Sequence, residues 1–168
     1  QHPEHSIFRQ HPLDYLESLE KCITTALAEL TEEQKDHVIG IGVDTTGSTP
    51  VPVDKNGTPL ALLDEFAENE NAMFFLWKDH AAAAEADEIN KLFRNNSEND
   101  YTKYQGDYSA EWYWAKILYA VRHDEAIRQA AYTWEEHCDW MTGILCGETR
   151  PEKIYHSACA AGHKALWH

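Results

Sequence analysis

Apolar residues that alternate with glycine, and then stop at an acid, mark the stretch around which the chain is organised. This stretch runs from Val38 to Asp54 and reads VIGIGVDTTGSTPVPVD. Apolar runs that are rich in β-branched residues and bounded by glycine and turn residues are typical of strands. The pattern therefore predicts strands over 38–44 and 49–53, and the letters KNG at 55–57 predict the turn that follows.

Glycines within the first of these strands suggest that something approaches it closely. Gly40 and Gly42 lie inside the predicted strand, where glycine weakens pairing and often marks contact with another backbone or a ligand. Asp44 stands at its carboxyl end, the edge at which open α/β sheets bind ligands. A buried strand followed by a capped turn explains the same letters, and the pattern alone leaves both interpretations open.

Leucine and isoleucine at helical spacing predict an amphipathic helix over 13–30, with Pro12 in its first turn and a capped turn at Thr31. Further helices are predicted over 81–93, 110–121, 124–131 and 132–145. Gly143 or Gly147 would end the last of them.

Two more apolar runs predict extended chain. Residues 59–63 predict a short strand, and 72–77 predict a strand or extended segment. The second would carry Trp77, Lys78 and His80 to a rim, although a core strand with a solvated end is the commoner arrangement. Helices mixed with strands favour an α/β layer over a helical bundle, within one domain.

Composition excludes several classes of partner. The 168 residues carry a net charge of −15, which disfavours binding to nucleic acid or to an anionic membrane surface. No apolar run approaches the roughly 20 residues that span a bilayer. Four cysteines without CxxC spacing indicate reduced thiols and a cytoplasmic location.

Motifs for metal, phosphate or acyl chemistry are absent or weak. Cys159, His163 and His168 form a C-x3-H-x4-H string, but a zinc site needs a fourth ligand, so no metal is expected. The chain has neither a GxxxxGK[ST] phosphate loop nor a GxSxG elbow. Its one GxG lies within a predicted strand instead of opening a helix, which makes a dinucleotide site improbable.

Longer strings carry a more specific resemblance. They include HPLDYLESLE, VIGIGVDTTGSTPVPVDKNGTPLALL, NAMFFLWKDH, SAEWYWAKIL, EHCDWMTGILCGETRPE and CAAGHKALWH. Together they run almost from end to end, and they resemble the FGGY family of carbohydrate kinases. The chain departs from that pattern at Gln105, at Glu70 and Glu135, where less charge is expected, and at Ala158, where a basic residue is expected.

The resemblance implies a fold and an activity. Such kinases have two lobes of the ribonuclease H or actin-like ATPase type, each a mixed sheet wrapped by helices. Residues 1–168 would be part of the first, sugar-binding lobe. The implied reaction transfers the γ-phosphate of ATP, as its Mg²⁺ complex, to the 5-hydroxyl of L-ribulose in arabinose catabolism. Another pentulose or glycerol kinase of the family, or a non-catalytic sugar-binding module, remains an alternative.

The resemblance also implies substrate-binding residues. Gly47 would present its backbone to the sugar, Trp77 would cover an apolar face of the ketopentose, and Lys164 would donate hydrogen bonds to its hydroxyls. Asp44, Thr46 and Lys78 would support this pocket. Without the resemblance, Trp77 would be taken as a packing residue and Lys164 as a surface lysine.

Other expected parts of the kinase have no counterpart in the sequence. The phosphate-loop strand would precede Gln1, and the catalytic base and the ATP lobe would follow His168. We therefore expect no catalytic residue here, no ATP or Mg²⁺ bound by this piece alone, and no kinase activity from it. A sheet that has lost a strand could also pair with a second copy to form a homodimer.

Overall fold

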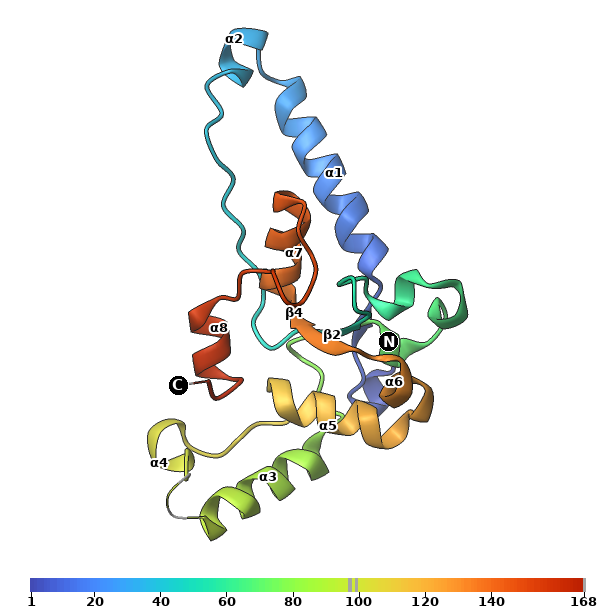
Figure 1. Cartoon of the computed structure of the whole chain (residues 1–168), viewed down its shortest axis with the longest axis vertical. Coiled ribbons are helices and arrows are strands. Elements are labelled where there is room, and N and C mark those ends of the chain that lie inside the picture. The colour runs from blue at the N-terminus through green and yellow to red at the C-terminus, as the bar shows by residue number, and fades with distance from the viewer. Residues whose placement is uncertain (97, 99, 168) are drawn as a thin grey trace.

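A long helical arm rises from a body of shorter helices and small sheets (Figure 1). The computed structural model describes residues 1–96, 98 and 100–167, without the side chain of His163. The arm consists of α1 (Pro12–Ala28) and α2 (Glu32–Lys35), and the chain returns from its tip as an extended loop toward the body. The mixed α/β class expected from the sequence is confirmed.

Two antiparallel pairs of strands form the centre of the body. β2 (Pro50–Val53) pairs with β4 (Thr133–Glu136), so that Pro50 lies opposite Glu136. β1 (Arg9–Gln10) pairs with β3 (Phe74–Phe75). The described residues thus contain two-stranded sheets, where the resemblance leads one to expect a larger mixed sheet.

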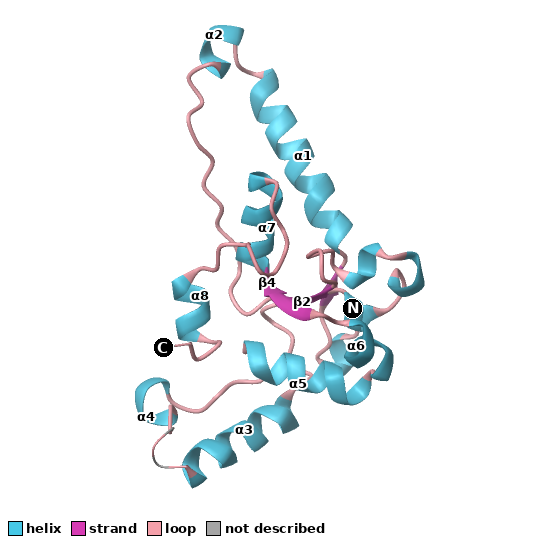
Figure 2. Cartoon of the chain, viewed as in Figure 1, coloured by secondary structure: helices cyan, strands magenta, loops and turns pink. Residues whose placement is uncertain are grey.

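Helices surround these strands (Figure 2). Beyond the arm they are, in chain order, α3 (Ala83–Asn95), α4 (Thr102–Gln105), α5 (Tyr113–His123), α6 (Glu125–Ala130), α7 (His137–Cys146) and α8 (Ala158–His163). Single 3-10 turns lie at Pro3–His5, Leu60–Leu62, Asp64–Phe66 and Glu70–Ala72. The predicted helices that became α1, α3, α5 and α6 are confirmed, and none of the described helices is long and apolar enough to cross a membrane.

The predicted strand over 38–44 is wrong. This segment is extended but pairs with no strand among the described residues, and Ile39 is 99% exposed. A Cβ added to Gly40 or Gly42 would meet no atom within 4 Å, so no other backbone among the described residues approaches these glycines closely. The hydrophobic pattern reports strand propensity, but a strand forms only where a neighbour supplies backbone hydrogen bonds.

Two other expectations also need correction. The helix predicted over 132–145 is divided, because its first residues form β4 against β2 and only the remainder forms α7. Tertiary pairing has here overridden helical propensity. The strand predicted over 59–63 is the 3-10 turn Leu60–Leu62, whereas the strand over 49–53 and the turn at 55–57 are confirmed.

The core that positions the site lies between β2, β3 and α7. Val51, Val53, Phe74, Trp140 and Met141 are buried there, and side chains from the first half of α1 pack against them. The N-terminal segment is fixed by a buried ion pair between Arg9 and Asp79. These contacts hold the start of β2 next to the start of α7.

Candidate functional site

A cavity of about 310 Å³ lies where the extended loop meets α7 and α8. Its lining comes from the loop before β2, the first turn of α7, and α8 with its flanking residues. The lining residues are Val43, Asp44, Thr45, Gly47, Ser48, Cys138, Ser157, Cys159, Ala160 and Lys164. Three of the six residues expected from the sequence, Asp44, Gly47 and Lys164, therefore meet at one cavity.

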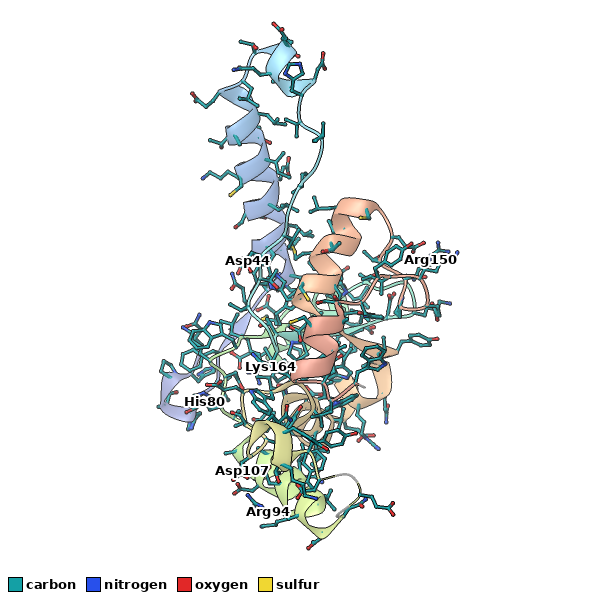
Figure 3. All side chains as sticks on the ribbon, turned by 90° about the vertical axis from the view of Figure 1, so that its left-hand side faces the viewer. Asp44, His80, Arg94, Asp107, Arg150 and Lys164 are labelled. Carbon is teal, nitrogen blue, oxygen red and sulfur yellow. The ribbon has the colours of Figure 1, made fainter. Side chains whose placement is uncertain are left out.

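Gly47 and Lys164 face each other across this cavity. The Lys164 Nζ atom donates a long hydrogen bond of 3.5 Å to the Gly47 carbonyl oxygen. A Cβ at position 47 would lie 3.4 Å from the same nitrogen, which is ordinary contact distance. Figure 3 shows Lys164 below Asp44 on the same side of the molecule. The cavity thus offers an ammonium group, a main-chain carbonyl and an exposed carboxylate.

The backbone around Lys164 is held by α5 and by the segment that precedes it. The Tyr108 hydroxyl donates to the Lys164 carbonyl at 2.5 Å, and Trp114 Nε1 donates to the Ala165 carbonyl at 2.7 Å. Burial raises the pKa of Tyr108, so this hydroxyl keeps its proton and remains a donor. The main chain that carries the Lys164 side chain is therefore held by residues some 50 positions earlier in the sequence.

Ser48 adopts an unusual backbone conformation beside Gly47. Its φ is 56°, in the left-handed region that residues other than glycine, Asn and Asp rarely adopt. The residue is buried, and its Oγ has no hydrogen-bond partner among the described residues. A strained residue with an unsatisfied hydroxyl at the wall of a cavity is a feature that recurs at ligand sites.

Two buried ionisable side chains, Lys116 and Glu136, form hydrogen bonds with the backbone of Ser48 and Thr49. Lys116 of α5 is fully buried and donates to the carbonyl oxygens of Ser48, at 2.5 Å, and Leu76, at 2.8 Å. Burial lowers the pKa of Lys116 to about 7. The Glu136 carboxylate accepts from the Thr49 amide at 2.6 Å, and burial raises its pKa.

Sequence reasoning assigned no role to Lys116 or Glu136. The signal that could have identified Lys116 is a lysine among the apolar residues of a predicted amphipathic helix. Such a charge is retained in a protein interior only when it finds partners. For Glu136 the sequence carried no such signal, because β4 was expected to be helical.

Asp139 positions α8 against α7. Its Oδ1 accepts from the Ser157 amide at 2.8 Å, and the Ser157 hydroxyl in turn accepts from the Ala160 amide at 3.3 Å to cap α8. Cys138 precedes Asp139 and lines the cavity, and burial raises the pKa of its thiol to about 12. This thiol is therefore protonated and unreactive at neutral pH.

The other expected site residues do not line the cavity. Trp77 is 51% exposed just beyond β3, and the Lys78 ammonium lies 4.7 Å from the centre of the Phe8 ring. Thr46 is exposed, with its hydroxyl 3.0 Å from that of Thr49. Lys116 links the Trp77 segment to the loop, because Leu76 and Ser48 share its ammonium. The roles assigned to Trp77, Lys78 and Thr46 stay predictions.

The C-x3-H-x4-H string lies only partly within the described residues. Cys159 is exposed at the cavity wall, whereas His168 and the side chain of His163 lie outside the described residues. All four cysteines are free thiols.

Comparison with known proteins gives a consistent result over the whole chain. The chain is 51% identical over 167 residues to a ribulokinase of Vibrio parahaemolyticus, which covers 99% of the chain and 30% of that relative. It is 37% identical over 158 residues to a ribulokinase of Bacillus licheniformis, covering 94% and 28%. A ribulokinase of Mycolicibacterium smegmatis is also 37% identical, over 157 residues, covering 94% and 27%.

No protein-family model matches the chain. The chain spans about 30% of the length of the relatives that it matches. Over that span the identity is 51% to the Vibrio relative and 34% to a ribulokinase of Staphylococcus aureus. Over the part of these relatives that it spans, the chain is therefore similar to ribulokinases from several bacteria.

Proposed function

We propose that this chain forms the sugar-binding part of an ATP-dependent ribulokinase, which phosphorylates the 5-hydroxyl of L-ribulose in arabinose catabolism. The names of its relatives support this assignment. The observation that carries it is the meeting of Asp44, Gly47 and Lys164 at one cavity, although Lys164 follows Gly47 by 117 residues. A finer assignment, to the ribonuclease H-like fold of the first lobe, rests on the resemblance and on the mixed α/β class.

The chemistry of the cavity suits a small polyol. Lys164 supplies three N–H donors, Asp44 supplies carboxylate acceptors, and the Ser48 hydroxyl can both donate and accept. A ketopentose carries several hydroxyl groups and a carbonyl that match such a mixture. Hydrogen bonds that involve a charged group contribute about 1.5 to 3 kcal/mol each, so Lys164 and Asp44 should contribute most to affinity.

The cavity does not fit Mg²⁺-ATP. Among the described residues that line it, Lys164 is the only cation and Asp44 the only carboxylate. A triphosphate with its metal ion needs several donors and more than one metal ligand. We therefore assign only the sugar to this cavity, and propose that the nucleotide is held by a part of the relatives that this chain does not span. The free thiols agree with a proposed cytoplasmic location.

Calorimetric titration with L-ribulose, D-ribulose, xylulose and glycerol tests the assignment. We expect L-ribulose to bind best, and Lys164→Met to weaken it by about 10-fold or more, since a charged hydrogen bond is lost. Lys55→Met removes an exposed lysine from the turn after β2 and serves as the control. Trp77→Ala tests the expected sugar-covering role separately.

Each outcome has a defined meaning. If Lys164→Met and the unaltered chain bound L-ribulose equally, Lys164 would not be a substrate-binding residue. Preference for xylulose or glycerol would indicate that the chain belongs to another kinase of the FGGY family. No heat with any sugar, from a sample whose circular dichroism shows the helices, would contradict the proposed pocket.

A further inference from the structure

A second cluster of polar side chains lies outside the sugar cavity. It joins Glu135 of β4, Asp139 of the first turn of α7, and His156 from the loop before α8. One ligand atom from each of these residues lies within 4.8 Å of the other two. The cluster borders a cavity of about 280 Å³ that is walled by aromatic residues from α5 and β4 and contains neither Gly47 nor Lys164.

Glu135 is the unexplained member of this cluster. The residue is 1% exposed, and its Oε2 has no hydrogen-bond partner among the described residues. That oxygen lies 3.7 Å from His156 Nδ1, so the carboxylate is directed into the cluster. An ionised carboxylate in a protein interior is costly unless a charge or hydrogen bonds compensate it. Its neighbour Glu136 shows the contrast, because it accepts a hydrogen bond from the Thr49 amide.

Asp139 is held in a fixed orientation. Its Oδ1 accepts from the Ser157 amide at 2.8 Å and from the Cys138 thiol at 3.3 Å. This arrangement leaves Oδ2 directed at His156 Nδ1, 3.0 Å away. In metal sites, hydrogen bonds of this kind to a ligating side chain fix its orientation.

His156 provides a route for an ion from solvent. Its side chain is about half exposed, whereas those of Glu135 and Asp139 are buried. The buried carboxylates and the exposed imidazole meet at the cavity rather than within a closed core. The remaining coordination positions would be filled by water from the cavity, which has room for several molecules.

We propose that Glu135, Asp139 and His156 bind a divalent transition-metal cation. Two carboxylate oxygens and one imidazole nitrogen suit Mn²⁺ and Zn²⁺, and they disfavour Ca²⁺, which takes oxygen ligands only. The cation neutralises the buried Glu135 carboxylate and links β4, α7 and the segment that leads into α8.

Titration with Mn²⁺, followed by electron paramagnetic resonance, tests the proposal. Mn²⁺ is the probe because it binds oxygen and imidazole ligands but not the exposed thiols of this chain. Glu135→Gln keeps the shape of the side chain and removes its charge, and His156→Gln removes the nitrogen ligand. We expect one equivalent to bind the unaltered chain, and both variants to bind at least about 10-fold more weakly.

Two controls separate this site from other interactions. Glu65→Gln changes an exposed carboxylate that is not part of the cluster, and Lys164→Met changes the sugar cavity. Both should bind Mn²⁺ as the unaltered chain does, so failure of the proposed sugar site would leave this result unaffected. Because His156 is half exposed, its variant should keep the fold even if Glu135→Gln does not.

Three results would overturn the proposal. One is the absence of stoichiometric binding up to about 1 mM Mn²⁺, the limit at which affinity becomes negligible. Another is undiminished binding by His156→Gln, which would place the ion on other surface groups. The third is equal weakening by Glu65→Gln, which would reduce the interaction to the general attraction of a chain with net charge −15.

Discussion

The ammonium of Lys116 lies 2.5 Å from the carbonyl oxygen of Ser48, although 68 residues separate the two in sequence. The same nitrogen donates to the Leu76 carbonyl at 2.8 Å. A single buried lysine thus joins the loop that carries Gly47 to the segment that carries Trp77. Their relative placement depends on this one side chain.

Replacement of Lys116 by methionine should destabilise the chain. Met has a similar length but no donor, so two carbonyl oxygens would lose a buried hydrogen bond. We expect the free energy of unfolding, measured with urea at pH 9, to fall by about 2 to 3 kcal/mol. Lys91→Met on the exposed face of α3 should change it by less than about 0.5 kcal/mol. An equal effect of both substitutions would contradict the role of Lys116.

The same lysine should produce a defined pH dependence. Its pKa is about 7 in the folded chain, below the value of about 10.4 of a free lysine. Between these values the unfolded state binds more protons than the folded state, so the contribution of Lys116 to stability rises with pH. The difference in unfolding free energy between the unaltered chain and Lys116→Met should therefore grow from pH 7 to pH 10. A difference that stayed constant over this range would show that Lys116 is not neutralised by burial.

His137 should destabilise the chain in acid. It is buried against Tyr15 and Phe74, neither ring nitrogen has a hydrogen-bond partner among the described residues, and burial lowers its pKa to about 4. Because the unfolded state binds the extra proton between about pH 4 and 6.5, stability contributed by the neutral ring is lost as pH falls through that range.

His137→Leu should remove this acid sensitivity. It should also raise the free energy of unfolding by about 1 to 2 kcal/mol at pH 7, because two unsatisfied polar atoms leave the core. Thermal unfolding at pH 5 and pH 7 measures both effects. His5→Leu, in an exposed position, should change neither. Loss of stability in His137→Leu would indicate that the ring makes polar contacts that stabilise the fold.

Gly57 should tolerate no side chain. Its φ is 78°, and an added Cβ would lie 1.7 Å from the Thr149 carbonyl oxygen. Gly147 is a matched control, since its φ is 72° but nothing lies within 4 Å of an added Cβ. We expect Gly147→Ala to cost about 1 to 2 kcal/mol from backbone strain alone. Gly57→Ala should cost about 3 kcal/mol or more, since steric overlap is added to the strain. Equal losses would show that the loop at Thr149 moves aside.

The sequence predicted correctly those elements that are determined by interactions between residues close together in the chain. The arm helix α1 begins at Pro12, and the His11 ring accepts a hydrogen bond from the Leu13 amide at its start. The proline at the start of the helix and the spacing of its apolar residues therefore predicted the same element. The turn at 55–57 was predicted for the same reason: Asp54, Asn56 and Gly57 suffice to build it.

Elements that depend on distant partners were predicted poorly. Residues 132–145 were expected to form one helix, yet residues 133–136 form β4 because β2 lies alongside. Residues 38–44 have strand propensity, yet they stay unpaired. For the candidate site, the resemblance pointed to Gly47 and Lys164. No local pattern could show that Lys116 contacts the loop that carries Gly47. The spacing of residues along the sequence does not reveal long-range contacts of this kind.

The exposed segment over 38–43 has a consequence for the behaviour of the protein in solution. It presents valine and isoleucine on an open backbone edge, which is a template for strand-to-strand association between copies. The net charge of −15 opposes such encounters, because each copy repels the next. This protection is electrostatic and therefore weakens as salt shortens the screening length from about 10 Å at 0.1 M to about 3 Å at 1 M. It also disappears near pH 4.9, where the chain carries no net charge. The colloidal stability of the protein thus depends on ionic strength as much as on its fold.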